Sequence, residues 1–283
     1  MKPQNQKDKL TVQITNLQDA DNKNGNALYV FACVMIGQFV LSRITASLKT
    51  GKVSELIAEI EWLLSNCDES RPNVLGNIIY SLALKDNLIK LIDILTLDSE
   101  IGNICDRSYQ HDNGFKKIVL LEGESFKLRL HVWEPAYKVR SEDNDLHDHR
   151  WDFASLMMKG SFVSVLYQES ENGIEERYPY TYLPVAGGDS YGLEKVSDSK
   201  VKLYESCRIL IKQGMGYFMP CQTVHKVEYE SEEKTVTMVI TDKPINNNCR
   251  MYSVDERSQV EEVIINRLDA RDIRNNLESL KYL

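Results

Sequence analysis

Two histidines lie one residue apart, His147 and His149, ahead of an apolar segment in the sequence DLHDHRWDFASLMMKG. Residues i and i+2 of a β-strand project from the same face, so both imidazole rings can take neighbouring positions around one metal ion. A third histidine, His225, follows in the segment MPCQTVHKVEY. Because histidine is the commonest metal ligand in proteins, the three side chains predict a metal site. The alternative is two exposed strand histidines and one turn histidine.

A charged residue and a fourth histidine alternate with apolar residues in FKLRLHVW. In a strand, Arg129, His131 and Trp133 share one face. We therefore predict that Arg129 orients an anionic substrate and that His131 acts beside it, as a catalytic group or a further ligand. The alternatives are an Arg129 paired with a carboxylate and a His131 that is packed in the core.

The spacing of these residues resembles the paired metal motifs of the cupin superfamily, G-x5-HxH-x3/4-E-x6-G and G-x5-PxG-x2-H-x3-N. The resemblance covers about residues 117–244. The matching positions are His147, His149 and Gly160 in the first motif, and Gly214, Pro220 and His225 in the second. The departures are Ser141 for the first Gly, Phe153 for the Glu, Gln222 for the inner Gly and Tyr229 for the Asn.

The resemblance implies a β-barrel that binds a metal through three histidines and no carboxylate. Such a site leaves coordination positions for substrate and dioxygen, as in the thiol dioxygenases. The segment VHKVEY is similar to a segment of that family. In that family an arginine at the place of Arg129 binds the substrate carboxylate. The family's Ser-His-Tyr relay has no counterpart, since Thr237, Val239 and Thr241 stand at those places. We therefore expect the iron site, Fe(II), but not a thiol substrate.

Aromatic and sulfur-containing residues near the histidines are candidates for the substrate pocket. Trp151 and Phe153 follow His149, and Cys221 precedes His225. We predict that all three contact the substrate, because an apolar wall suits a site that activates oxygen. The alternative is that they are ordinary core residues.

Composition restricts the partners. The chain has 283 residues, a formal net charge of -8 and a pI near 5.3. This charge repels phosphate backbones and anionic lipids, so we expect neither nucleic acid nor a membrane surface as partner, but a small molecule. The six scattered cysteines indicate reduced thiols and a cytoplasmic protein. The polar N-terminus lacks the pattern of a signal peptide.

The distribution of apolar residues predicts an α+β protein in four parts. Residues 1–25 are expected to form a flexible arm and residues 26–108 a helical domain, in which 27–44 is a buried helix rather than a membrane span. Short alternating strands over 109–250 predict the barrel. Charged helical spacing over 251–283 predicts a C-terminal helix packed on the barrel or on a second subunit of a homodimer.

Three hypotheses on function follow. The first is a mononuclear non-haem Fe(II) oxygenase or oxidase that acts on a small anionic metabolite with dioxygen. The second is a non-redox enzyme, an isomerase, lyase or hydrolase, that uses Zn, Mn or Ni as a Lewis acid. The third is a barrel that senses a ligand. The sequence holds no GxGxxG, P-loop, HExxH or GxSxG motif.

Overall fold

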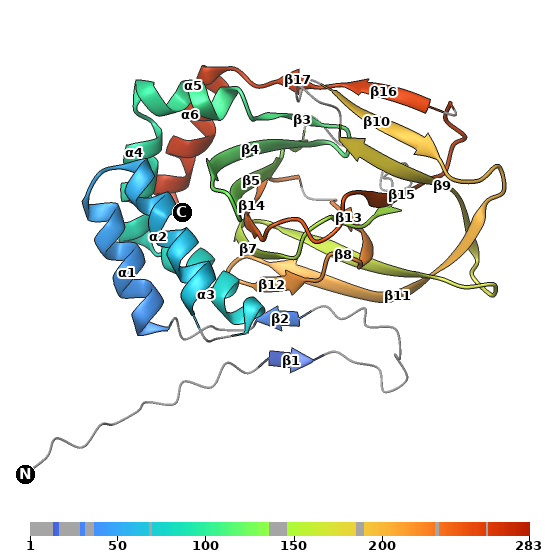
Figure 1. Cartoon of the computed structure of the whole chain (residues 1–283), viewed down its shortest axis with the longest axis horizontal. Coiled ribbons are helices and arrows are strands. Elements are labelled where there is room, and N and C mark those ends of the chain that lie inside the picture. The colour runs from blue at the N-terminus through green and yellow to red at the C-terminus, as the bar shows by residue number, and fades with distance from the viewer. Residues whose placement is uncertain are drawn as a thin grey trace, which may run out of the picture.

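The helices gather at one end of the molecule and the strands at the other (Figure 1). The computed structural model describes residues 14–16, 29–31, 37–67, 70–135, 146–184, 190–229, 232–258 and 260–283. The helices are α1 (Gln38–Lys49), α2 (Val53–Asn66), α3 (Arg71–Ala83), α4 (Lys85–Leu95), α5 (Asp98–Cys105) and α6 (Ala270–Ser279), followed by the 3-10 turn η2 (Leu280–Tyr282). The predicted helical character of the N-terminal region is confirmed for α1 to α5.

The strands form two antiparallel sheets. The first has the order β1 (Ile14–Asn16), β2 (Tyr29–Phe31), β12 (Gly216–Met219), β7 (Phe153–Lys159), β14 (Thr235–Thr241), β5 (Lys127–Trp133), β4 (Phe115–Glu122), β3 (Tyr109–His111), β17 (Asn266–Arg267). The second has the order β11 (Val201–Lys212), β8 (Ser161–Glu169), β13 (Val224–Glu228), β6 (Leu146–His147), β15 (Cys249–Ser253), β9 (Glu175–Pro184), β10 (Ser190–Lys195), β16 (Val260–Ile264).

The α+β prediction is confirmed, and the strand pairs are antiparallel. The described strands do not form one closed sheet, however. They make two sheets, and β11 also pairs with β9 in addition to β8. Gly160, at φ 77°, forms the turn that carries the chain from β7 in the first sheet to β8 in the second. A side chain at this position would collide with Thr235.

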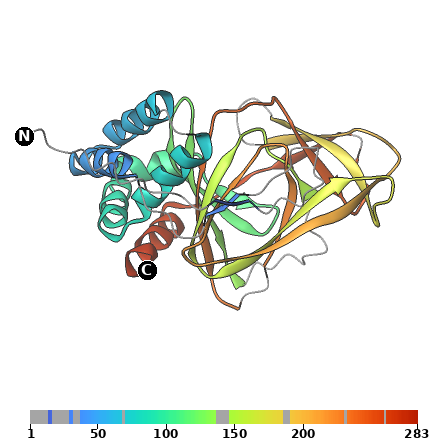
Figure 2. The same cartoon turned by 90° about the horizontal axis from the view of Figure 1, so that it is seen from below.

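Strand β5 of the first sheet has an aliphatic outer face and an inner face with charged and aromatic residues. In β5, Leu128, Leu130 and Val132 are buried in the core that also holds Leu56 and Ile60 of α2. Alternation therefore turns Arg129, His131 and Trp133 towards the second sheet. The helices cover the outer face (Figure 2), and so the space between the sheets is left for the functional site.

Two expectations from periodicity are wrong. Tyr29–Phe31, expected to begin a buried helix, is strand β2 and pairs with β1 and β12. Val260–Ile264 and Asn266–Arg267, expected to be helical, pair with β10 and β3, so the C-terminal helix α6 begins only at Ala270. These segments are strands because they pair with the edges of distant strands. Local periodicity in the sequence contains no information on such pairing.

The two ends of the chain lie in different parts of the fold. Most of the expected flexible arm, 1–25, lies outside the described residues, and its Ile14–Asn16 is strand β1. Helix α6 packs against α5 and shares the core of the helices through Ile273 and Leu277. None of the five cysteines in the described ranges is in a disulfide. No helix there is long and apolar enough to cross a membrane.

Candidate metal centre and substrate cavity

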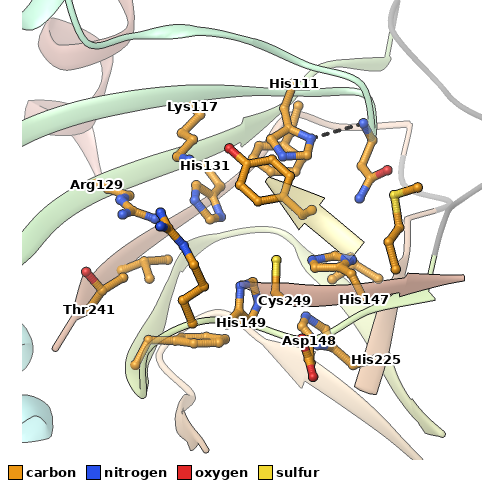
Figure 3. Close-up of a pocket in the computed structure, with 18 of the residues that line it drawn as sticks. His111, Lys117, Arg129, His131, His147, Asp148, His149, His225, Thr241 and Cys249 are labelled. Carbon is orange, nitrogen blue, oxygen red and sulfur yellow. Dashed lines mark hydrogen bonds between the residues drawn. The ribbon is translucent and has the colours of Figure 1, made fainter. Parts of the chain in front are cut away.

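All five histidines of the chain line one cavity of about 170 Å³ between the two sheets. His147, His149 and His225 lie on the side formed by the second sheet (Figure 3). Arg129 and His131 come from β5 in the first sheet, and Lys117 comes from β4. The cavity therefore joins side chains that are far apart in the sequence.

Strand pairing brings the three predicted metal ligands together. His147 in β6 is the direct antiparallel partner of His225 in β13. His149 lies just beyond β6, and its backbone N–H donates to the carbonyl of Cys221 at 2.8 Å. The three ring centroids are 4.8 to 5.0 Å apart. One nitrogen from each ring lies within 4.8 Å of the others.

This donor set fits a divalent transition metal. Imidazole nitrogens suit Fe, Zn, Ni and Cu, and two bonds of about 2.1 Å place neighbouring nitrogens roughly 3.0 to 3.4 Å apart. The 4.8 Å spread is larger, so metal binding would draw the rings inward by small side-chain rotations. Three protein ligands also leave positions for other molecules.

The electrostatic state of the histidines suits metal binding. Burial lowers the pKa of His149 well below its ordinary value and that of His225 to about 3, because a buried imidazolium is poorly solvated. Both rings are thus neutral. Nδ1 of His225 lies 3.3 Å from the carbonyl oxygen of Thr223. The tautomer with its proton on Nδ1 donates to this carbonyl and leaves the Nε2 lone pair for a metal.

An ion pair between the buried Asp148 and the half-exposed Arg250 supports the backbone of the HxH segment. Asp148 points away from the two histidines beside it, and its carboxylate accepts from the backbone N–H and from Nε of Arg250, both at 2.7 Å. The guanidinium also donates to the carbonyl of Gln222 at 3.0 Å. These bonds connect the segment just after β6 with β15 and with the turn before β13, and so they join the chain beside His147 and His149 to the chain that leads into His225.

Phe153, at the motif position of the cupin glutamate, lies against the histidines. Its ring is perpendicular to that of His149 at 5.0 Å between centroids and lies 6.4 Å from that of His225. The side chain is only 5% exposed. Trp151 stacks on His149 at 6.1 Å. Both predicted aromatic residues line the cavity.

Three cations on the cavity wall have no carboxylate partner among the described residues. Arg129 is 5% exposed and its buried Nε has no hydrogen-bond partner. Its guanidinium lies 4.7 Å from the ring centre of Trp151. Arg150 lies 5.0 Å from the same ring centre, and its Nε also lacks a partner. Lys117 donates to the hydroxyl of Tyr109 at 2.8 Å.

The remaining histidines flank Phe115. Its ring stacks on His111 at 4.5 Å and meets His131 at 4.6 Å. Nδ1 of His111 accepts from the backbone N–H of Asn113, whereas Nε2 of His131 is buried without a partner. Burial lowers the pKa of both histidines well below the ordinary value. His131 thus presents a neutral imidazole with one free nitrogen.

The structure does not place Cys221 on the cavity wall. The residue is buried, its backbone N–H donates to Asp152 at 2.8 Å, and its carbonyl holds His149. Sequence reasoning missed Lys117 and Cys249, which do line the cavity. The alternation in FKKIVLLE could have revealed Lys117, because it puts the lysine on the face opposite the buried Ile118.

Comparison with known proteins adds only distant likenesses. No family model and no curated protein matches the chain. Among solved structures, TT1209 from Thermus thermophilus is 16% identical, with 48% of this chain and 90% of that chain covered and a TM-score of 0.28.

Two hydroquinone 1,2-dioxygenases are similarly distant. PnpCD, in complex with Cd2+ and 4-hydroxybenzonitrile, is 15% identical, with 45% of this chain and 63% of that chain covered and a TM-score of 0.27. The enzyme from Sphingomonas sp. TTNP3, with 4-hydroxybenzoate bound, is 11% identical, with 45% and 65% covered and a TM-score of 0.28. The match thus spans less than two thirds of either dioxygenase chain. Likeness at this level does not indicate a shared activity.

Proposed function

We propose that this protein is a metal-dependent enzyme of the cupin kind, a mononuclear non-haem Fe(II) oxygenase or oxidase that acts on a small anionic metabolite. The observation that carries the proposal is the convergence of three histidines in one cavity with cations that have no carboxylate partner among the described residues. A site that binds only a metal ion would not require these cations. A negatively charged substrate would interact both with the metal ion and with the cations.

Each part of the cavity has a separate task in this proposal. His147, His149 and His225 would hold the ion, which when bound supplies a Lewis-acidic, redox-active centre with positions for dioxygen and substrate. Arg129 binds the negative group of the substrate and fixes its orientation. Phe153 excludes water from the side nearest His149.

His131 is the candidate for proton transfer. Its neutral ring has a buried Nε2 without a protein partner among the described residues, and this nitrogen can accept a proton or a hydrogen bond from a substrate hydroxyl. The stack on Phe115 fixes the plane of the ring. Lys117 and Thr237 lie beside His131 on the neighbouring strands, in register with it.

The second candidate is a hydrolase, lyase or isomerase with Zn, Mn or Ni. The observation that favours this second function is the ligand set, because three histidines also suit Zn(II). Zn(II) polarises carbonyls and activates water without redox chemistry. Arg129 and His131 would keep their tasks. The two functions differ in the need for dioxygen.

The test is metal analysis of protein purified without chelator, followed by oxygen-electrode traces against a panel of small carboxylic acids. The control is Cys105→Ala, a substitution at a half-buried cysteine of helix α5 outside the cavity lining. Iron at one equivalent with oxygen uptake that depends on an acid is the expected result. Bound zinc with turnover but no oxygen uptake would replace the first function by the second, and no bound metal would refute both.

A further inference from the structure

We infer that the cavity takes a monocyclic aromatic acid, with its acidic group between Arg129, Lys117 and Arg150 and its ring along the aromatic wall towards the histidines. This inference rests on the proposed function, because it names the substrate class of the same site. It depends on three features of the described residues: the cations, the size of the cavity and its lining.

The cations belong to one group on one side of the cavity. Val119 on β4 is the cross-strand partner of Arg129, and Lys117 is two residues from it, on the same face. Arg129 and Arg150 both stand over the ring of Trp151. Lys117 and Arg129 lie together on the wall that faces the three metal-binding histidines (Figure 3).

The neighbouring Lys116 differs from Lys117 in that it forms ion pairs with carboxylates of the protein. Lys116, on the opposite face of β4, lies 3.1 Å from Glu134 and 2.7 Å from Asp272. Lys117 and Arg129 have no such partner among the described residues, although burying a charge without one is unfavourable. A bound anion provides the missing compensation and three sets of donors for its oxygens.

The size of the cavity limits the body of the substrate to one ring. Its volume is about 170 Å³, and an apolar cavity of roughly 150 Å³ in another protein binds benzene. Eight aromatic side chains line it besides the histidines: Tyr109, Phe115, Trp133, Trp151, Phe153, Tyr182, Tyr191 and Tyr217. Flat aromatic walls favour a planar ring, through offset and edge-to-face contacts.

A second cavity fixes which end of the molecule is the acidic one. It has about 420 Å³ and shares Lys117, Arg129, Arg150 and Trp151 with the first cavity. The cations thus lie at the junction between the cavities, and the histidines line only the inner one. An acid that fills the inner cavity therefore puts its charge at the junction and its ring beside the metal-binding side.

The experiment uses the metal-free full chain, so that it does not depend on metal or oxygen chemistry. Benzoate, its neutral isostere benzamide, and acetate, which has the charge without the ring, are titrated by calorimetry or ligand-observed NMR. Benzoate is expected to bind about tenfold or more tightly than either of the others. Arg129→Met and Lys117→Met are each expected to weaken benzoate about tenfold to a hundredfold.

Lys127→Met is the matched control. This lysine is on the same strand as Arg129, lines only the second cavity and pairs with Glu122. It should change the benzoate affinity less than about twofold. Equal binding of benzoate and benzamide, equal binding of benzoate and acetate, no binding of benzoate, or equal effects of Lys127→Met and Arg129→Met would each overturn the inference. None of these results bears on metal content or oxygen uptake, which test the proposed function separately.

Discussion

Replacing Phe153 by glutamate restores the carboxylate of the cupin motif and tests where this side chain lies. The ring of Phe153 is 5.0 Å from that of His149 and 6.4 Å from that of His225. A glutamate side chain at the same position can extend towards the space between these histidines. We therefore expect Phe153→Glu to bind a divalent metal more tightly than the native protein and to oxidise its substrate less or not at all.

Two opposing effects set the magnitude. Loss of the buried ring should lower the free energy of unfolding of the metal-free protein by about 3 to 5 kcal/mol. A carboxylate about 5 Å from a doubly charged ion gains roughly 7 kcal/mol at an effective dielectric constant near 20. Desolvation of the carboxylate cancels several kcal/mol of this. A net gain of about 1.4 to 2.8 kcal/mol corresponds to a tenfold to hundredfold tighter metal complex.

The assay is competition between the metal-free protein and a chromophoric chelator for Fe(II) or Zn(II), together with thermal unfolding with and without metal. Phe153→Gln is the control, because glutamine has the shape of glutamate without its charge. It should lose a similar free energy of unfolding without tighter metal binding. If the Glu and Gln variants have the same metal affinity, Phe153 is a packing residue away from the ion, and the alignment of the first motif is wrong.

Three further outcomes are expected. His147→Ala and His225→Ala should each lose bound metal, by elemental analysis, while far-UV circular dichroism remains native; full metal content in both would remove them from the site. Asp148→Asn should weaken metal binding about tenfold in the chelator assay, because it breaks the ion pair that supports the HxH segment; an unchanged affinity would make the pair purely structural. A bound anion beside Lys117 favours its protonated, cationic form. In the ligand-free protein, burial and neighbouring cations lower the pKa of Lys117 well below its ordinary 10.5, so between the lowered pKa and 10.5 the unfolded chain holds more protons than the folded chain, and stability rises with pH up to about 10.5. Lys117→Met should therefore raise the free energy of unfolding of the metal-free protein at neutral pH, less the lost bond to Tyr109, and the gain should shrink towards pH 10.5; a gain independent of pH would show that Lys117 keeps its proton.

Residue spacing predicted the grouping of the three histidines because a strand has a fixed period. The i and i+2 rule put His147 and His149 on one face, and the second motif supplied His225, which the structure pairs with His147. The same period correctly turned Arg129 into the cavity. These features depend on local geometry, which the sequence contains.

Features that depend on pairing between distant segments were not predictable in this way. Strand β16 pairs with the edge of β10. The charged segment that contains β16 is a strand because of this pairing, which lies outside its own sequence pattern. Cys221 is near His225 in sequence, but the turn directs its backbone rather than its thiol to the site. The group formed by Lys117 and Arg150 brings together two segments whose proximity no short-range pattern contains.

The most direct test of the metal centre is a crystal structure of the protein soaked with Fe(II) and measured at the iron absorption edge. We expect one anomalous peak, about 2.0 to 2.3 Å from one nitrogen of each of His147, His149 and His225, with no protein carboxylate bound. A peak elsewhere, or one bound by fewer than three of these histidines, would contradict this expectation.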